Sequence, residues 1–430
     1  MTRAFYLAPR YLSRGVTAHP LGVHCAAVSR SLTRQRSAVI ADDHALLDGL
    51  CRAVELGATL LDTADWYGCE HAERLIGRFL RECRDLPLIL SSKVGRLQGS
   101  APHSYGDRHI HHQLKQSLEN LYADCLDLYF LDSFDFGEGD RYLGPAIDQM
   151  VTLRELGLIK SIGMRGPHIG YGASPAEQQA RAERFLHLFR LIKPNVVWMR
   201  YNALAPAIQL EGEDVFDFTR RHGVGPVLST PLPHGSLTGA ATTDQQPQDP
   251  TRPPGISSTG HTAQEREVVA SGLQALREHF GDAPDMLLAL RWCLRRSDHC
   301  VVVVGLADAA QMEETFARLG APLTDAELAA VEEIYAHIHA GSATARHSKQ
   351  GARALPTRTR IAAHACRTTD DAKPRATPHP LITEPHVPCQ LKGGPCERDR
   401  LRLGPMRPGE LHEHAKHRCR PDAGSRPDRH

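Results

Sequence analysis

The sequence predicts an α/β protein built as a (β/α)8 TIM barrel with a disordered C-terminal tail. Eight short apolar runs alternate with longer amphipathic segments between residues 20 and 340, as this barrel requires. A doubly wound open sheet remains the alternative, because regular strand–helix alternation is common to both architectures. The expected strands are residues 20–28, 58–62, 86–93, 126–132, 159–164, 195–199, 225–229 and 300–305.

The composition changes sharply near residue 343. We expect residues 1–343 to form one barrel domain, with a long loop at 242–262 where Pro, Gly, Ser and Thr gather. Residues 344–430 are rich in Pro, Arg and His and carry about twice as many Lys and Arg as Asp and Glu. Such a segment buries too little apolar surface to offset its ordering entropy, so we expect a disordered tail. Polyanion binding by this basic tail is the alternative.

Overall charge and hydropathy indicate a small-molecule protein of the cytoplasm. The 430 residues carry a formal charge of +1, so no strong field favours nucleic acid or a membrane surface. No apolar run approaches the roughly 18 residues that span a bilayer, and the N-terminal segment has no signal-peptide core. The eleven cysteines show no framework spacing, which favours reduced thiols. Cys389, Cys396 and Cys419 lie near several histidines, but the spacing fits no zinc pattern, so no metal is expected.

The residues that close the expected strands are mostly polar. The carboxyl ends of barrel strands meet at one face, where such enzymes keep their chemistry, so these residues should ring one cleft. In strand order, starting from the second strand and the connection after it, they are Asp62 and Tyr67, Lys93, Asp132, Arg165, Trp198, Ser229 and Gly305.

Several stretches resemble the aldo-keto reductase family, whose members transfer hydride between a nicotinamide cofactor and a carbonyl or alcohol on a (β/α)8 barrel. They occur in the family's order and cover most of residues 20 to 340. The most specific is the Asp-Thr-Ala-x-x-Tyr-Gly motif followed by a strand that ends in lysine. The matching stretches are "LLDTADWYG", "LILSSKVGR", "LDLYFLD", "GLIKSIGM", "NVVWMRYNAL", "TPLPHGSLTG" and "VVVVGLADAAQMEET".

Asp62, Tyr67 and Lys93 suit carbonyl reduction. Hydride arrives at carbon while a proton must reach oxygen, so the site needs an acid. An ammonium close to Tyr67 would lower its pKa from about 10, and Lys93 can supply that charge. Asp62 can hold Lys93 by a charge-assisted hydrogen bond. The structural alternatives are a helix cap for Asp62, a half-buried aromatic for Tyr67 and a surface lysine for Lys93.

Other positions depart from what the resemblance implies. The family usually places a histidine where Asp132 stands, and we expect Asp132 to work as a neutral acid if the barrel mouth raises its pKa. Arg165 and Trp198 replace residues that grip the nicotinamide amide, and Ser229 replaces an aromatic that often stacks on the ring. Trp198 is an alternative stacking partner and Arg165 an alternative anion ligand.

The resemblance also implies a cofactor, NAD(H) or NADP(H). A helix beginning after Gly305 would receive phosphate at its N-terminus. Residues 306–308 offer no base for a 2′-phosphate, and Asp308 would repel one, which favours NAD(H). The segments expected to wrap the cofactor contribute Pro231, Leu232, Gly235, Leu237, Gly239, Gly305, Gln311 and Glu314.

The leading functional hypothesis is therefore an oxidoreductase acting on an aldehyde, ketone or sugar-like alcohol, with Tyr67 as proton donor. The alternative is a non-catalytic barrel that binds a nucleotide or regulates a partner, which the altered Asp132, Arg165 and Trp198 favour. The sequence indicates neither the substrate nor the oligomeric state.

Overall fold

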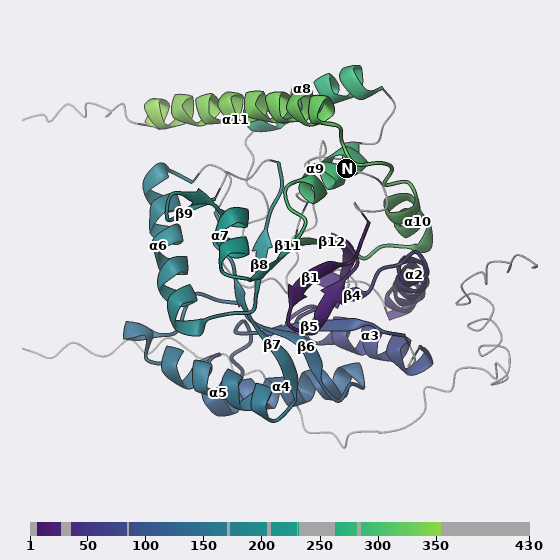
Figure 1. Cartoon of the computed structure of the whole chain (residues 1–430), viewed down its shortest axis with the longest axis vertical. Coiled ribbons are helices and arrows are strands. Elements are labelled where there is room, and N and C mark those ends of the chain that lie inside the picture. The colour runs from purple at the N-terminus through teal and green to yellow at the C-terminus, as the bar shows by residue number, and fades with distance from the viewer. Residues whose placement is uncertain are drawn as a thin grey trace, which may run out of the picture.

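A computed structural model describes residues 7–26, 36–83, 86–169, 173–203, 208–229, 231, 263–281 and 285–353. Its centre is a closed parallel barrel with the strand order β11-β12-β3-β4-β5-β6-β7-β8 (Figure 1). Each strand falls on one of the eight expected runs, which confirms the barrel over the open sheet. The barrel strands are β3 Leu21–His24, β4 Leu60–Asp62, β5 Ile89–Val94, β6 Leu126–Leu131, β7 Ile159–Arg165, β8 Val196–Arg200, β11 Gly225–Ser229 and β12 Val301–Gly305.

Helices surround the barrel, and their sequences show why they form. Ser174 and Glu177 make a capping box at the start of α6, with Pro175 as its first residue. In α3 the apolar residues recur at helical spacing, and Leu75, Ile76 and Phe79 are buried. The helices are α2 Arg36–Glu55, α3 His71–Glu82, α4 Asp107–Leu121, α5 Leu143–Glu155, α6 Pro175–Ile192, α7 Val215–Arg221, α8 Ala263–Phe280, α9 Asp285–Arg295, α10 Ala309–Ala317 and α11 Asp325–Arg353.

The last helix runs across the expected domain boundary. Figure 1 shows α11 lying across one side of the barrel beside α8. The helix continues to Arg353, past the boundary expected at residue 343. The rest of the predicted tail lies outside the described residues. Within the described part of the chain, no helix is long and apolar enough to cross a membrane.

The barrel interior changes from apolar to polar along several strands. Because side chains alternate between the two faces of a strand, every second residue points inward. On β4 the inward residues are Leu60 and then Asp62, and on β6 they include Phe130, followed by Asp132 just after the strand ends. Apolar side chains therefore fill the lower barrel, and the polar ones gather at the carboxyl-terminal mouth.

A hairpin absent from our expectation closes the other end of the barrel. It consists of β1 Arg10–Ser13 and β2 Val16–Ala18, which pair antiparallel. Leu12 belongs to the same buried cluster as the inward barrel residues. The Arg10 guanidinium donates to the carbonyls of Ser297 at 2.7 Å and Cys300 at 2.8 Å, which fixes the hairpin to the segment before β12. Two further short strands, β9 Gln209–Leu210 and β10 Glu213–Asp214, pair with each other outside the barrel.

Candidate active site

Asp62 is the centre of a buried polar cluster at the barrel mouth. It closes β4, where its register partners are His24 on β3 and Ser91 on β5. The Lys93 ammonium lies 2.8 Å from both carboxylate oxygens of Asp62, and Ser91 donates to Oδ1 at 2.6 Å. His24 Nδ1 lies 2.7 Å from Oδ2, and Trp198 Nε1 donates to the same oxygen at 3.2 Å. The predicted pairing of Asp62 with Lys93 is thus present in the structure.

This pairing decides the charge of Asp62. Burial by itself raises the pKa of a carboxyl group, but the Lys93 charge and the His24 hydrogen bond more than offset it. The pKa of Asp62 therefore lies below its usual range, and the side chain is ionised. The helix-cap alternative does not hold, because the N-cap position of α3 is Glu70. The surface-lysine alternative fails as well, since the Lys93 side chain is fully buried.

Tyr67 sits in the connection between β4 and α3. Gly68, Cys69 and Glu70 follow it with φ of 61°, 50° and 68°, the left-handed region. For the two non-glycine residues this conformation costs roughly 1–2 kcal/mol each, a strain typical of functional loops. The Tyr67 ring packs edge-on against Trp66, with centroids 4.5 Å apart, and Lys93 Nζ lies 5.2 Å from its centroid.

The protonation of Tyr67 differs from the expectation. Burial, followed by the charges of Asp62 and Asp132, raises the pKa of Tyr67 well above its usual value of 10. Lys93 does not reverse this effect because its ammonium is held by Asp62 and by the Thr63 carbonyl at 2.6 Å. The expected lowering of the Tyr67 pKa by Lys93 is therefore wrong in this state, and Tyr67 is a protonated phenol.

Asp132 is an ion-paired carboxylate. Arg165 Nη1 donates to its Oδ1 at 2.7 Å, while Arg96 Nε at 3.3 Å and Trp66 Nε1 at 3.2 Å both donate to Oδ2. Burial raises its pKa, but the charges of Arg165, Arg96 and Lys93 outweigh burial, so the pKa of Asp132 lies below its usual range. The hypothesis of a neutral acid at this position is wrong, because two guanidiniums lie where an apolar surface was assumed.

This ionisation makes the protein's stability depend on acid pH. A carboxyl group whose folded-state pKa is lowered stabilises the fold above its unfolded pKa, near 3.8, and this stabilisation is lost as pH falls. We expect the melting temperature of Asp132→Asn to fall less steeply than that of the wild type below about pH 4. Asp135→Asn, at a side chain 79% exposed, is the control and should keep the wild-type slope. Equal slopes for wild type and Asp132→Asn would contradict the buried ion pair.

Trp198 covers the Asp62–Lys93 pair from β8. Its ring centroid is 5.0 Å from Lys93 Nζ and 5.7 Å from the Arg165 guanidinium carbon. The ring of His168 stacks against the ring of Trp198, with an angle of 10° between the ring planes and centroids 6.3 Å apart. Trp198 is thus an aromatic wall of the mouth, at the position where the resemblance implies a nicotinamide contact.

Two buried polar side chains without hydrogen bonds among the described residues follow or end the strands on either side of β8, the strand that carries Trp198. Both ring nitrogens of His168, after β7, are buried without a hydrogen bond inside the described part of the chain. The hydroxyl of Ser229, at the end of β11, is also buried and has no hydrogen-bond partner among the described residues. Burial and nearby arginines lower the pKa of His168 well below 6.5, so the ring is neutral. Unpaired buried polar groups are unfavourable, and a bound amide would satisfy them.

The helix after β12 is less open to phosphate than expected. Gly305 is exposed, but Asp308 caps α10 and its carboxylate accepts from the Gln311 backbone amide at 3.0 Å. Gln311 also donates its side-chain amide to Asp308, and Glu314 is half-buried. One of the backbone amides at this helix N-terminus, that of Gln311, is therefore already occupied. Pro231 is buried, while Leu232, Gly235, Leu237 and Gly239 lie outside the described residues.

His24, Arg96 and Trp66 complete the site and were missed at the sequence level. His24 is the last residue of the first barrel strand, β3. Its position at a strand end is the same sequence signal that points to Asp62 and Lys93. Arg96 and Trp66 stand in loops, so no strand register predicts them. Gly95 has a φ of 114°, and an added Cβ there would lie 2.4 Å from the Tyr105 hydroxyl, so only glycine makes the turn that carries Arg96.

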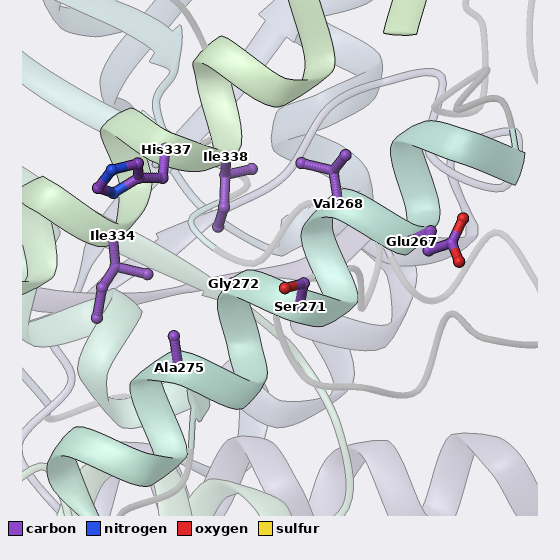
Figure 2. Close-up of a pocket in the computed structure, with 8 residues that line it drawn as sticks. All are labelled: Glu267, Val268, Ser271, Gly272, Ala275, Ile334, His337 and Ile338. Atoms are coloured by element: carbon purple, nitrogen blue, oxygen red, sulfur yellow. The ribbon is translucent and has the colours of Figure 1, made fainter.

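A separate pocket lies between α8 and α11, outside the barrel. Figure 2 shows the side chains that line it. The volume of this pocket is about 460 Å³. None of the mouth residues contributes to it, so it is not the site of the chemistry considered above. Its lining residues are Glu267, Val268, Ser271, Gly272, Ala275, Ile334, His337 and Ile338.

In the described part of the chain, no group of three or more His, Cys, Asp or Glu side chains is placed to hold a metal ion.

Comparison with known proteins places the chain in a family. It is 24% identical over 294 residues to an aldo-keto reductase, yakc [NADP(+)], of Schizosaccharomyces pombe, covering 66% of this chain and 80% of that one. It is 22% identical to an NADH-specific methylglyoxal reductase of Escherichia coli K12, over 68% and 88% of the two chains. The glycerol dehydrogenase AKR11B4 of Gluconobacter oxydans shares the fold, with a TM-score of 0.58 and 19% identity over 76% of this chain and 95% of that one. The model of the aldo/keto reductase family matches residues 32–336, and the chain belongs to this family.

Proposed function

We propose that the protein is a nicotinamide-dependent oxidoreductase that reduces the carbonyl of a small aldehyde or ketone, with Tyr67 as the proton donor. The observation that carries this proposal is the buried Asp62–Lys93 pair, placed beside Tyr67 at the mouth of a barrel of this family. Relatives named as an NADP(+) reductase and an NADH-specific reductase support the reaction class.

Tyr67 supplies the proton. Because burial and two carboxylates raise its pKa, Tyr67 is fully protonated at neutral pH and can donate to a carbonyl oxygen. As negative charge moves from the substrate oxygen to the phenol oxygen, the Arg165 and Arg96 charges favour the resulting phenolate. The protonated resting state suits reduction better than alcohol oxidation, which would need a deprotonated Tyr67 as base.

Asp62 and Lys93 fix the geometry. The ammonium is held by Asp62 and the Thr63 carbonyl, so its position beside the Tyr67 ring does not depend on the substrate. Such preorganised charges stabilise a transition state without reorganisation during the reaction. His24 also contacts Oδ2 of Asp62, and its ring lies edge-on to Tyr67, with centroids 5.2 Å apart.

The mouth fits a nicotinamide cofactor. When bound, NAD(H) or NADP(H) supplies the hydride. The orphaned ring nitrogens of His168 and the Ser229 hydroxyl offer partners for the nicotinamide amide, and Trp198 provides an aromatic surface beside them. The small-molecule partner is therefore a carbonyl substrate that enters between this wall and Tyr67.

Cofactor binding tests the proposal directly. Trp66 and Trp198 are two of the three tryptophans of the chain, so NADH or NADPH should quench the intrinsic fluorescence. Binding of neither would overturn the oxidoreductase. A nucleotide-binding barrel without catalysis is the second candidate, favoured because Trp198 covers Lys93 and because Tyr67 is only 2% exposed. Binding of a dinucleotide without hydride transfer to any aldehyde would favour that candidate.

We expect NADH to bind at least as tightly as NADPH. Leu306, Ala307 and Asp308 offer no base to a 2′-phosphate, and the Asp308 carboxylate at the start of α10 repels one. Competition between the two cofactors measures the preference. Asp308→Ser keeps a capping side chain but removes the charge, so it should shift the preference toward NADPH. A clear NADPH preference in the wild type would contradict this assignment.

A further inference from the structure

Asp132 holds two arginines together at the barrel mouth. Arg165 comes from the end of β7 and Arg96 from the turn after β5, and each donates one hydrogen bond to a different oxygen of Asp132. Two guanidiniums repel each other, and a carboxylate between them is the arrangement that keeps both close and oriented. Trp66 Nε1 donates to the same carboxylate and restrains it further. We call Arg96, Arg165 and Asp132 the arginine clamp.

The arginine clamp carries one positive charge more than its carboxylate neutralises. The neighbouring Lys93 and Asp62 cancel each other, so this excess remains at the mouth. The Arg96 side chain is 20% exposed and that of Arg165 is 15% exposed, and each uses one of its five N–H donors on Asp132. Inside the described part of the chain the remaining donors of these two arginines have no hydrogen-bond partner.

The arginine clamp is adjacent to the proton donor. Trp66 links the two, because its indole nitrogen donates to Asp132 while its ring packs on Tyr67 with centroids 4.5 Å apart. Arg165 also lies over the ring of Trp198. Burial and the charges of Arg165, Arg200 and Arg96 lower the pKa of His168, which indicates a positive potential around the same mouth. A substrate whose carbonyl reaches Tyr67 therefore places its next few atoms against free guanidinium donors.

We propose, on the basis of the function proposed above, that the substrate is an aldehyde or ketone that carries a carboxylate or phosphate group. Guanidinium forks bind both anions through paired charge-assisted hydrogen bonds. In this assignment Arg96 and Arg165 determine substrate specificity, and Asp132 is the positioning residue that orients them. This role explains why position 132 is an aspartate and not the histidine that the family usually has. A carboxylate is needed there to orient the two arginines that bind the anion.

Matched substrates test the arginine clamp. We expect kcat/KM for 4-carboxybenzaldehyde to exceed that for its neutral isostere 4-formylbenzamide by at least about tenfold at low salt, and the ratio to fall as salt rises. Glyceraldehyde 3-phosphate against glyceraldehyde provides the phosphate arm, so the two comparisons distinguish the two anions. Equal values within both pairs would overturn the anionic substrate while leaving the reductase function intact.

Substitutions locate the effect. Arg165→Gln and Arg96→Gln should each reduce the ratio between anionic and neutral substrates, mainly through KM. Arg190→Gln removes an exposed arginine of α6 and should leave the ratio unchanged. The double variant Arg165→Gln with Asp132→Asn keeps the net charge of the clamp. It should also lose the preference, and a preserved ratio there would overturn the oriented clamp.

A binding measurement decides the inference if no aldehyde is turned over. In the presence of NADH, benzoate and inorganic phosphate should change the tryptophan fluorescence at lower concentrations than benzamide does. Arg165→Gln should weaken the benzoate response and leave the benzamide response alone. If benzoate and benzamide bind the wild type with equal affinity and phosphate does not change the fluorescence, the inference is overturned independently of catalysis.

Discussion

Replacing Tyr67 by phenylalanine is expected to lower kcat for carbonyl reduction by about 10²- to 10⁴-fold, the usual contribution of a positioned general acid. The phenol is protonated in the resting state because burial and the charges of Asp62 and Asp132 raise its pKa. Its hydroxyl acts on the substrate oxygen, so the dissociation constant of NADH should not change. Steady-state rates and fluorescence titration measure the two quantities.

Tyr129→Phe is the matched control. It removes another buried hydroxyl, one with no hydrogen-bond partner among the residues described, from a strand of the same barrel. Turnover should survive this change. If Tyr67→Phe retains wild-type turnover, Tyr67 is not the acid, and the proposed mechanism is wrong even if the dinucleotide binds.

The pH profile of reduction gives a second check on the same residue. A tyrosine tuned by Lys93 to a low pKa would lose its proton, and its activity as an acid, near neutral pH. With the raised pKa, the contribution of Tyr67 should persist throughout the range from pH 6 to 9. The structure therefore reverses the expectation drawn from the sequence, where the charge of Lys93 was considered without the carboxylate that binds it.

The fold could be predicted well because barrel strands carry local signals. Each strand is a short apolar run, and strand register brings the closing residues to one face, so Asp62 and Lys93 could be paired before the structure was known. The hairpin formed by β1 and β2 gives no such signal. Its strands have four and three residues, and Leu12 is recognisable as core only once the barrel above it is closed.

The electrostatics of the site could not be predicted in the same way. The charge of Asp132 depends on Arg96 and Arg165, and the position of Arg96 depends on a glycine turn after β5. A difference of a few ångströms in that turn decides whether the carboxyl group meets a guanidinium or an apolar wall, and so reverses the direction of its pKa shift. Restoring the family's usual residue by Asp132→His would leave both guanidiniums without their carboxylate, so we do not expect it to raise activity.

Lys93→Met is expected to have the largest effect on stability. It leaves the Asp62 carboxyl group fully buried without its counter-charge, and among the residues described His24, Ser91 and Trp198 remain as its hydrogen-bond partners. Breaking a buried ion pair by removing one partner typically costs about 3–5 kcal/mol, a loss that urea denaturation measures. Thermal unfolding should move to a clearly lower temperature.

A second substitution separates the structural role of Lys93 from its catalytic role. In the double variant Lys93→Met with Asp62→Asn, the buried charge is gone and the amide still offers an oxygen to His24 and Ser91, so most of the lost stability should return. Turnover should not return, because the fixed ammonium beside the Tyr67 ring, 5.2 Å from its centroid, is still missing. A stable double variant with wild-type kcat would show that the pair only supports the fold. A Lys93→Met variant as stable as the wild type would contradict the buried, ionised pair itself.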